Sequence, residues 1–393
     1  MLTVDELECE GKTVFLRVDF NVPLEKNLEI RDDTRIRASL PTLNHLIQKN
    51  AKIIIASHLG RPKGKIVPEL SMLPVARRLE QLISRKVNLA PDIIGDDVEN
   101  MKNSLDENSV LLLENLRFHP GEKENDPEFA RKLASKVDLY INDAFGTCHR
   151  AHASVVGISP FVKRSAAGYL VQKEIEYLDQ VIHSPKKPYI AILGGAKVSD
   201  KIPVIRNLLH KADSLLIGGA MAFTFFAAQG FSVGRSLVES DKIDTAREII
   251  HLSDKENIQI LLPEDHVASS SVDDTQNIQT LSSFPFPDNL MGLDIGPNTI
   301  ARYSEMITQA KTIFWNGPMG VFEKEEFSVG TTSIARAVAD SPALSIVGGG
   351  DSVAAVLKAG VYKDISHIST GGGASLEYIA NETLPGIEVL KEK

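Results

Sequence analysis

Short runs of wholly apolar residues alternate along the chain with segments whose apolar residues recur at helical spacing. Strands that are apolar throughout must be buried on both faces, and a parallel sheet covered by helices on both sides provides such burial. In the first half, the predicted strands are residues 13–18, 52–56, 110–113 and 138–141, and helical spacing covers 34–49, 73–85 and 127–137. The alternation thus predicts an α/β fold built on a doubly wound parallel sheet.

The same alternation starts again after a proline-rich junction. Residues 173–182 have the pattern of a polar-sided helix, and Ser184-Pro185-Lys186-Lys187-Pro188 follows. Two prolines in so short a stretch favour a domain boundary, and a length of 393 residues suits two domains. Beyond the junction, predicted strands span 189–193, 214–217, 259–262, 311–314, 344–347 and 367–369, with helices that include 202–209, 220–228, 328–339 and 352–359. We therefore expect two doubly wound parallel-sheet domains, residues 1–170 and 187–375, joined by a connecting helix and hinge at 171–186.

The composition argues against several classes of function. With 43 basic and 52 acidic residues the formal net charge is −9, so neither a nucleic acid nor an anionic membrane is expected as a partner. The N-terminal residues are acidic and form no apolar signal core. The only cysteines are Cys9 and Cys148, so no disulfide framework or paired-cysteine metal site is expected, and a cytoplasmic location is predicted.

One uncharged stretch, residues 214–234, has the length of a membrane span. Gly218-Gly219 divides it, and Gln229-Gly230 ends its second part. We interpret it as a buried strand followed by a short buried helix, so no membrane association is expected.

Arginine and histidine recur after the predicted strands of the first half. In open parallel sheets, ligands bind beyond the carboxyl ends of the strands. The segments at these positions are Asp19–Asn21, Ser57–Pro62, Glu114–His119 and Asp143–His152. Taken singly, each arginine also fits a surface ion pair. Because arginine binds carboxylate and phosphate groups through two parallel hydrogen bonds, the recurrence favours a site for a small polyanion.

Glycine recurs after the strands of the second half instead. The positions are Gly194-Gly195, Gly218-Gly219, Asn316-Gly317-Pro318, Gly348–Asp351 and Gly371–Gly373. Bare backbone lets phosphates and a flat base approach closely. Lys197 and Lys201 follow Gly194-Gly195 where a strand turns into a helix, and free N–H groups and the helix dipole favour anions there. A phosphate site is the functional interpretation, and a strand–helix turn with solvated lysines is the alternative.

Two carboxylates of the second half have a functional and a structural interpretation. Asp351 precedes a predicted helix and suits Mg²⁺, which binds one or two carboxylates together with phosphate oxygens. A helix N-cap is the alternative for Asp351. Glu323 suits a contact to a nucleotide ribose, or a solvated position.

Three other motifs resemble functional sites but lack a feature that each site requires. Residues 60–66 lack the spacing of a Walker loop and the Ser or Thr after its lysine. His149-x-x-His152 has no third metal ligand at suitable spacing. Nothing in the sequence indicates a lowered pKa for the Cys148 thiol, which we expect to be a small filler.

Seven motifs in this order resemble the phosphoglycerate kinase family, and the resemblance covers essentially the whole chain. They are Leu16–Pro23, Ser57–Pro62, Asp143–His152, Gly194–Lys201, Trp315–Glu323, Gly348–Ser352 and Gly371–Ser375. The resemblance implies two Rossmann-like domains, with residues 376–393 returning to pack on the first. It implies the glycolytic reaction, a reversible phosphoryl transfer between 1,3-bisphosphoglycerate with Mg-ADP and 3-phosphoglycerate with Mg-ATP. A monomer with Mg²⁺ as its cofactor is implied as well.

Carried onto matching positions, the resemblance implies the residues that bind each ligand. In the first domain, 3-phosphoglycerate would be bound by Asp19, Asn21, Arg35, His58, Leu59, Gly60, Arg61, Arg117 and Arg150. In the second, the nucleotide would be bound by Gly195, Lys197, Lys201, Gly218, Gly219, Gly292, Asn316, Glu323, Gly349, Gly350, Asp351 and Ser352, with Asp351 at the metal. Residues 263–289 look atypical, notably Glu264-Asp265-His266, which concerns only the rim on the nucleotide side.

The implied chemistry needs no general base, because the acceptor is a carboxylate that is already ionised at neutral pH. Positioning and charge stabilisation remain, and Arg35 and Lys197 are predicted to be the catalytic cations nearest the transferred group. In-line transfer in a closed interdomain cleft would exclude water. Two alternatives are a non-catalytic two-lobed sensor of an anion and a nucleotide, and a kinase for another small acid or sugar phosphate.

Overall fold

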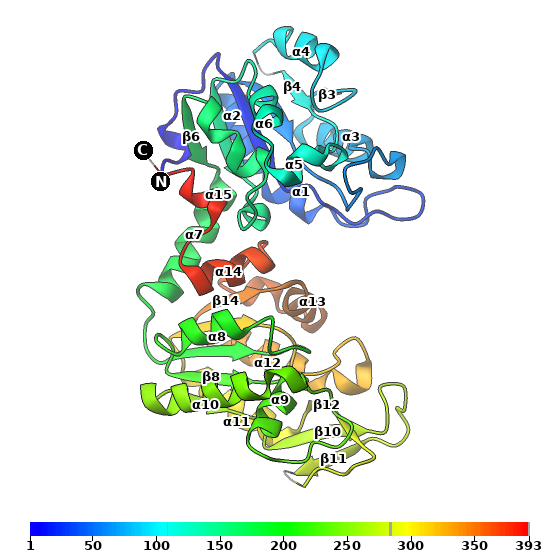
Figure 1. The fold of residues 1–393 in the computed structure, drawn as a ribbon, viewed down its shortest axis with the longest axis vertical. Coiled ribbons are helices and arrows are strands. Elements are labelled where there is room, and N and C mark those ends of the chain that lie inside the picture. Colours follow the sequence, from blue (N-terminus) through cyan, green and yellow to red (C-terminus); the bar gives the residue numbers. More distant parts are fainter. Residues whose placement is uncertain (108, 283–284, 392–393) are drawn as a thin grey trace. The chain divides into compact units, whose positions relative to one another are not determined.

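The chain forms two compact units, each with its own parallel sheet (Figure 1). A computed structural model describes residues 1–107, 109–282 and 285–391. Unit 1 comprises Met1–Glu176 and Thr383–Lys393, and unit 2 comprises Tyr177–Glu382. Residues 376–382, which the sequence placed in the returning segment, lie in unit 2. The predicted α/β class with two doubly wound parallel sheets is confirmed.

In unit 1 the central strand is β1 (Thr13–Val18), and the strands that follow it in sequence are added on both of its sides. The sheet has the order β3-β4-β2-β1-β5-β6 and is parallel throughout. Its other strands are β2 (Lys52–Ala56), β3 (Val87–Leu89), β4 (Val110–Leu112), β5 (Leu139–Asp143) and β6 (Arg164–Ala167). Because β2 and β5 pair with β1 on opposite sides, the loops after these strands emerge together at a topological switch point.

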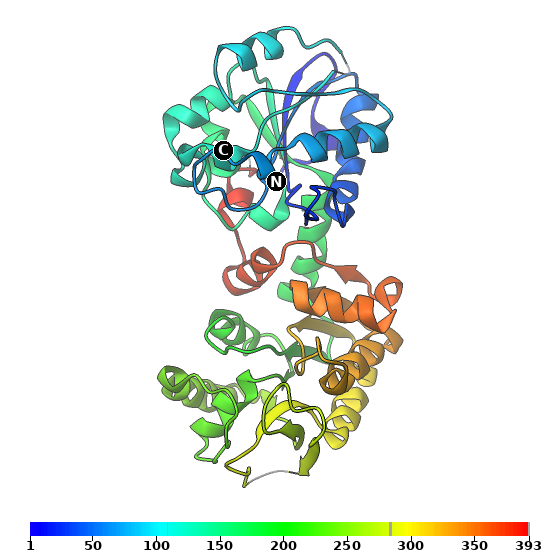
Figure 2. The same ribbon diagram turned by 90° about the vertical axis from the view of Figure 1, so that its right-hand side faces the viewer.

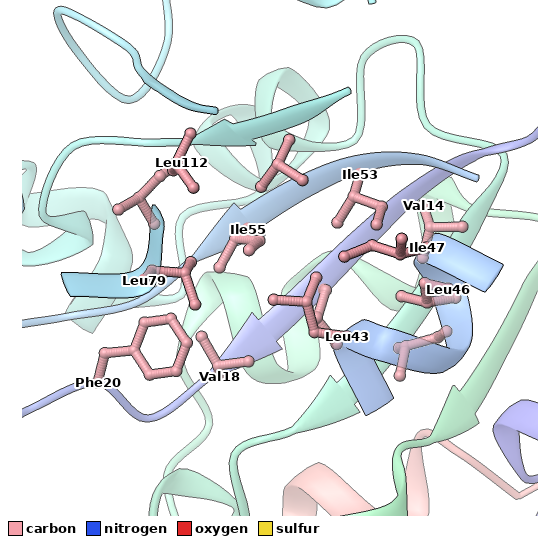
Figure 3. Close-up of a cluster of buried hydrophobic side chains, with 14 of the residues drawn as sticks. Val14, Val18, Phe20, Leu43, Leu46, Ile47, Ile53, Ile55, Leu79 and Leu112 are labelled. Atoms are coloured by element: carbon pink, nitrogen blue, oxygen red, sulfur yellow. The ribbon is translucent and has the colours of Figure 1, made fainter. Parts of the chain in front are cut away.

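One face of this sheet forms the main core of unit 1. Side chains alternate between the two faces of a strand, so Val14, Leu16 and Val18 of β1 point to the same side and are buried there. Figure 3 shows residues of helix α2 (Leu40–Gln48) lying over this face, namely Leu43, Leu46 and Ile47. Arg17 lies between Leu16 and Val18 in the strand, so its side chain points to the opposite face of the sheet.

The helical spacing of residues 34–49 produces two helices rather than one. They are α1 (Thr34–Ala38) and α2 (Leu40–Gln48), with Ser39 between them. Pro41 lies in the first turn of α2, where its missing N–H costs nothing, but it would remove an internal hydrogen bond from a continuous helix. The remaining helices of unit 1 are α3 (Leu73–Ile83), α4 (Asp96–Asn103), α5 (Pro120–Glu124), α6 (Pro127–Leu133) and α15 (Pro385–Glu388).

Both ends of the described chain belong to unit 1 (Figure 2). The amide of Leu2 donates to the carbonyl of Leu390 at 3.4 Å, and the amide of Gly386 in α15 donates to the carbonyl of Cys148 at 2.8 Å. Helix α7 (Tyr169–Ile182) begins in unit 1 and ends in unit 2. The 206 residues Tyr177–Glu382 form unit 2, and the C-terminal segment that follows them belongs to unit 1 again.

Unit 2 is also wound in both directions from its first strand, β7 (Tyr189–Leu193). The parallel sheet has the order β15-β14-β13-β7-β8-β9. Its other strands are β8 (Ser214–Ile217), β9 (Gln259–Leu261), β13 (Thr312–Asn316), β14 (Leu344–Gly348) and β15 (His367–Ile368). Its helices are α8 (Ile202–Leu208), α9 (Met221–Ala228), α10 (Ile243–Glu256), α11 (Pro297–Gln309), α12 (Val329–Asp340), α13 (Gly350–Ala359) and α14 (Gly373–Asn381).

A second, antiparallel sheet in unit 2 was not predicted. It has the order β11-β10-β12, with β10 (Asp265–Ser269), β11 (Gln279–Ser282) and β12 (Met291–Ile295). It lies largely within the stretch that looked atypical, of which residues 283–284 are outside the described chain. The uncharged segment near residue 220 forms β8 and the buried helix α9, as interpreted from the sequence. Within the described ranges, none of the helices combines the length and the apolarity needed to cross a bilayer.

Candidate functional site

Four adjacent strands of unit 1 bring its predicted site residues to one edge of the sheet. β4, β2, β1 and β5 are neighbours and run parallel, so the segments after them emerge side by side. Asp19 and Asn21 follow β1, and His58 to Arg61 follow β2. Arg117 lies in the short helix η3 (Leu116–Phe118) after β4, and Arg150 follows β5.

Asp19 lies next to two of the predicted site residues, Arg35 and His58. Its Oδ2 accepts a hydrogen bond from Nη1 of Arg35, at 2.6 Å. Its Oδ1 lies 3.8 Å from Nδ1 of His58. The side chain of Arg35 is 42% exposed, whereas the side chain of Asp19 is 15% exposed. The hydrogen bond to Asp19 therefore fixes the orientation of the Arg35 side chain, and much of that side chain remains accessible to a ligand.

Hydrogen bonds with two asparagine side chains and with Arg117 fix the loop after β2. Asn21 Oδ1 accepts from the amide of Gly60 at 2.8 Å, and Arg117 Nη1 donates to the carbonyl of Gly60 at 2.8 Å. The side chain of Asn115 accepts from the amide of Leu59 at 3.1 Å and donates to its carbonyl at 2.7 Å. Gly60 has φ of +60°, a conformation that disfavours a side chain. Leu59 itself is buried, so of this loop Arg61 offers the exposed side chain.

The arginines of unit 1 are close enough to perturb one another. Burial, followed by the repulsion of Arg150 and Arg17, lowers the pKa of Arg117 to about 10. Burial lowers the pKa of His58 well below its ordinary value, and Arg17, Arg117, Arg150 and Arg35 lower it further. Like charges gathered in this way are costly unless an anion neutralises them. The cationic cluster formed by Arg35, Arg117 and Arg150 around His58 is therefore suited to a ligand with several negative charges.

In unit 2, the turns after β7, β8 and β13 pack backbone against backbone. The amide of Gly195 donates to the carbonyl of Pro318 at 2.8 Å, and that of Gly219 donates to the carbonyl of Met319 at 2.9 Å. Gly195 and Gly219 have φ of +101° and +67°. A Cβ on Gly219 would lie 2.6 Å from the backbone nitrogen and oxygen of Gly195. Only glycine allows these turns to approach so closely.

A cavity of about 240 Å³ opens beside these turns. Its walls include five of the predicted nucleotide-binding residues, namely Gly195, Gly219, Gly292, Glu323 and Asp351. Gly218 lies next to the cavity wall, where a Cβ would meet Sδ of Met319 at 2.5 Å. Phe223, Leu293 and Val321 supply apolar surface. An apolar slot with a few polar groups at its rim is the usual form of a site for a flat organic ligand.

The predicted phosphate-binding residues follow β7, β13 and β14. Nζ of Lys201 contacts Oδ1 of Asn316, whose Nδ2 donates to the carbonyl of Gly348 at 2.7 Å. Burial lowers the pKa of Lys201 to about 8, against the opposing attraction of Asp200 and Asp351. Lys197 is exposed. Lys201 is therefore a partly desolvated cation that an anion would stabilise.

The segment after β14 forms the start of helix α13. Gly349 precedes the helix with φ of +92°, and a Cβ there would lie 2.7 Å from Nδ2 of Asn316. Gly350 and Asp351 form the first turn and are exposed, whereas Ser352 is buried and accepts from the amide of Gly317 at 2.6 Å. Of these four residues, Asp351 alone offers a carboxylate.

The donor set around Asp351 decides which kind of metal could bind. In the described residues, no group of three or more His, Cys, Asp or Glu side chains could enclose a metal ion. A single exposed carboxylate at a helix start fits a Mg²⁺ ion that is held mainly by phosphate oxygens. The residues present therefore fit a metal that arrives with a nucleotide.

Several residues of these sites were not predicted from the sequence. Asp294 lines the cavity of unit 2, and burial raises its pKa to about 7. His266 also lines it, packed against Phe223 with ring centroids 4.9 Å apart, and burial lowers its pKa to about 4. In unit 1, Arg17 and Glu122 are fully buried, and their charges act on Arg117. An arginine inside an otherwise apolar strand was the one available signal, and it applies to Arg17.

Comparisons with known proteins agree along the whole chain. A family model described as phosphoglycerate kinase matches residues 4–382. The phosphoglycerate kinase of Anaeromyxobacter sp. (strain Fw109-5) is 54% identical over 393 residues, which cover 99% of both chains. That of Chlorobium phaeobacteroides (strain BS1) is 53% identical over 390 residues, covering 98% of both.

Two solved structures are similar as well. The structure of phosphoglycerate kinase from Coxiella burnetii has a TM-score of 0.91 and 40% identity, and covers 99% of this chain and 98% of that one. The crystal structure of phosphoglycerate kinase from Pyrococcus horikoshii OT3 has a TM-score of 0.86 and 37% identity, with the same coverage.

Proposed function

Because the chain belongs to the phosphoglycerate kinase family, we propose that its two units divide the substrates of the family's reaction between them. The activity is the reversible transfer of a phosphoryl group between 1,3-bisphosphoglycerate with ADP and 3-phosphoglycerate with ATP. In this assignment the cationic cluster of unit 1 binds the phosphoglycerate, and the cavity of unit 2 binds the nucleotide. The observation that supports it most directly is the gathering of Arg35, Arg117 and Arg150 around His58 in an acidic protein.

The phosphoglycerate has a carboxylate at one end and a phosphate at the other, which matches a cluster of arginines. Arg35 gives one of its five N–H donors to Asp19, so the others can face the ligand in a fixed orientation. The amides of Gly60 and Leu59 donate to the side chains of Asn21 and Asn115, which fixes the loop that carries Arg61. The acceptor carboxylate needs no base, so unit 1 contributes orientation and charge stabilisation.

On the nucleotide side, the glycine turns would admit the base and ribose to the cavity, with Glu323 at the ribose. Lys197 and Lys201 would bind the phosphates together with Asn316 and the start of α13, which comprises Gly349, Gly350, Asp351 and Ser352. Asp351 would hold Mg²⁺, which neutralises phosphate charge when it is bound. Arg35 and Lys197 would lie nearest the transferred group, one from each unit.

The setting of the activity is part of the same proposal. Both cysteines are buried free thiols, which suits a reducing cytoplasm. The net charge of −9 favours small anions held by a local cationic cluster over a nucleic acid or a membrane partner. We infer a monomer, which light scattering of the purified protein tests directly.

The test is a spectrophotometric assay with 3-phosphoglycerate and Mg-ATP, coupled to glyceraldehyde-3-phosphate dehydrogenase and NADH. The purified protein should turn over, and Lys197→Ala should lower kcat by about 10³-fold, or about 4 kcal/mol in the barrier. Arg61→Ala should raise KM for 3-phosphoglycerate and leave KM for Mg-ATP nearly unchanged. Equal effects of Arg61→Ala on both KM values would contradict the division of substrates between the units.

A further inference from the structure

Glu122 is a buried carboxylate of unit 1 whose charge acts on Arg117, and the proposed function assigns it no role. It lies in α5 and has no exposed surface. Its Oε2 accepts from the amide of Ser154 at 3.0 Å, and its Oε1 accepts from the hydroxyl of Ser154 at 2.7 Å. Burial raises the pKa of Glu122, and the charges of Arg17 and Arg117 oppose this rise. A carboxylate is buried at such a cost only when its partners are well placed.

Ser154 connects Glu122 to the arginines. Its hydroxyl accepts a hydrogen bond from Nε of Arg17 at 2.8 Å, while it donates to Glu122. Nη1 of Arg17 also contacts the carbonyl of Val18. The guanidinium is thus fixed at two of its nitrogens, and it is fully buried. Arg17 contributes to the repulsion that lowers the pKa values of His58 and Arg117, so its position affects both of these residues.

The same serine belongs to the segment that follows Arg150. Ser154 is in the π-helical turn η5 (Ala153–Gly157), a rare form that is frequent at functional sites. His152 precedes this turn, and its amide donates to the carbonyl of Arg150 at 2.9 Å. Nδ1 of His152 lies 3.8 Å from Oε1 of Glu122. Tyr140 from β5 donates to the carbonyl of Ser154 at 3.0 Å. Glu122 therefore contacts Ser154 and His152, which closely follow Arg150 in the sequence and help to fix its position.

We propose that Glu122 is a positioning residue for the phosphoglycerate, acting through Ser154 on Arg17 and on the Arg150 segment. The inference rests on the proposed assignment of this ligand to unit 1. Charge alone predicts the opposite effect, because a negative group beside an anion site weakens anion binding. The two explanations therefore differ in the sign of a measurable change.

The experiment measures KM for 3-phosphoglycerate and KM for Mg-ATP in Glu122→Gln and Ser154→Ala. Glutamine keeps one acceptor oxygen and replaces the other by a donor, so it can retain one of the two bonds from Ser154. Alanine at 154 removes the bridging hydroxyl but keeps the carboxylate. We expect each variant to raise KM for 3-phosphoglycerate about tenfold, with KM for Mg-ATP within about twofold of the parent. A lowered or unchanged KM for 3-phosphoglycerate in both variants would overturn the proposal.

A pair of controls with the same kind of hydrogen bond, but with a partly exposed carboxylate, lies elsewhere in unit 1. The hydroxyl of Ser135 donates to Oε2 of Glu99 at 2.7 Å, the same bond at the same length, but Lys102 and Lys136 are the cations that act on Glu99. Glu99→Gln and Ser135→Ala should lower thermal stability and leave both KM values unchanged. If they raise KM for 3-phosphoglycerate as much as Glu122→Gln does, the effect is general loosening of the unit and the proposal fails.

Arg150→Ala separates this inference from the assignment on which it rests. If Arg150→Ala raises KM for 3-phosphoglycerate and the Glu122 and Ser154 variants do not, the positioning role is wrong while the site stands. If Arg150→Ala has no effect on that KM, the site assignment itself is wrong. Should Glu122→Gln fail to fold, Ser154→Ala decides the question alone.

Discussion

At the scale of a single residue, Lys201 should make nucleotide binding depend on pH. Its pKa in the free protein is lowered to about 8 by burial, so the ammonium loses its charge just above neutral pH. Bound phosphates favour the charged form and raise this pKa, so binding must take up a proton at higher pH. Affinity for Mg-ADP should therefore fall as pH rises, by about tenfold from about pH 7 to about pH 9. Calorimetric titration across this range measures it.

Lys201→Arg is the matched variant for this prediction, because a guanidinium stays charged throughout the range. Its affinity for Mg-ADP should be nearly independent of pH above about pH 7, and any titration of the ligand itself affects both proteins equally. A parent and a Lys201→Arg variant with the same pH profile would show that Lys201 is not the titrating group.

Residues could be predicted where their position in the sequence fixed their position in the fold. Arg117 and Arg150 follow strands, and parallel strands place such residues at one edge of a sheet. Glu122 and His266 could not be predicted in the same way. Each is a polar residue whose burial depends on partners distant in the sequence, Ser154 for Glu122 and Phe223 for His266. Their neighbours in sequence give no sign of that burial.

At the scale of elements, the close approach of the turns after β7, β8 and β13 should limit substitution at Gly219. A Cβ at Gly219 would press on the backbone of Gly195 at 2.6 Å and on the carbonyl of Pro318 at 2.9 Å. Because these atoms are backbone, the turn that precedes Lys197 would have to move. Gly219→Ala should therefore raise KM for Mg-ATP by about 5- to 30-fold, since a displaced phosphate-binding turn costs on the order of 1–2 kcal/mol.

Gly230→Ala provides the control for backbone strain. Gly230 also has a positive φ, +88°, but a Cβ there would meet nothing within 4 Å. Both substitutions force alanine into a conformation that costs roughly 1–2 kcal/mol, and only one displaces another turn. Thermal stability should fall in both variants, while KM for Mg-ATP should rise in Gly219→Ala alone. If KM for Mg-ATP rises equally in Gly219→Ala and Gly230→Ala, backbone strain explains the effect and the packing argument is wrong.

The elements themselves differ in how far the sequence determined them. Strands such as β1, β2 and β7 consist mainly of apolar residues, and nearly all of their side chains are buried, so they were predictable. β6 and β11 are short and partly exposed, with polar residues that give no alternating pattern. β10 contains Asp265 and His266, whose burial follows from tertiary partners, including Thr299 at the start of α11. Local pattern alone cannot anticipate such strands.

At the scale of the whole molecule, each unit contains its own core. The apolar cluster of unit 1 is drawn from residues between Val4 and Ala166, and that of unit 2 from residues between Ile190 and Ile365. A ligand that binds one unit therefore stabilises that unit, by about 2.7 kcal/mol at a concentration of 100 Kd. The C-terminal segment provides the sharpest test, because it is continuous in sequence with α14 of unit 2 but belongs to unit 1.

Hydrogen exchange measured by peptide should separate the two helices at this end of the chain. Helix α15 is tied to unit 1, since Gly386 donates to Cys148 at 2.8 Å and its carbonyl accepts from Asn142 Nδ2 at 3.4 Å. With 3-phosphoglycerate alone, exchange should slow in β1, β5 and α15 and stay unchanged in α14. With Mg-ADP alone, it should slow in β7, β13 and α14 and stay unchanged in α15.

Slower exchange in α15 with Mg-ADP alone would mean that the nucleotide stabilises unit 1, and that the substrates are not divided as proposed. Arg61→Ala should abolish the first pattern and keep the second, because it weakens only the binding of the phosphoglycerate.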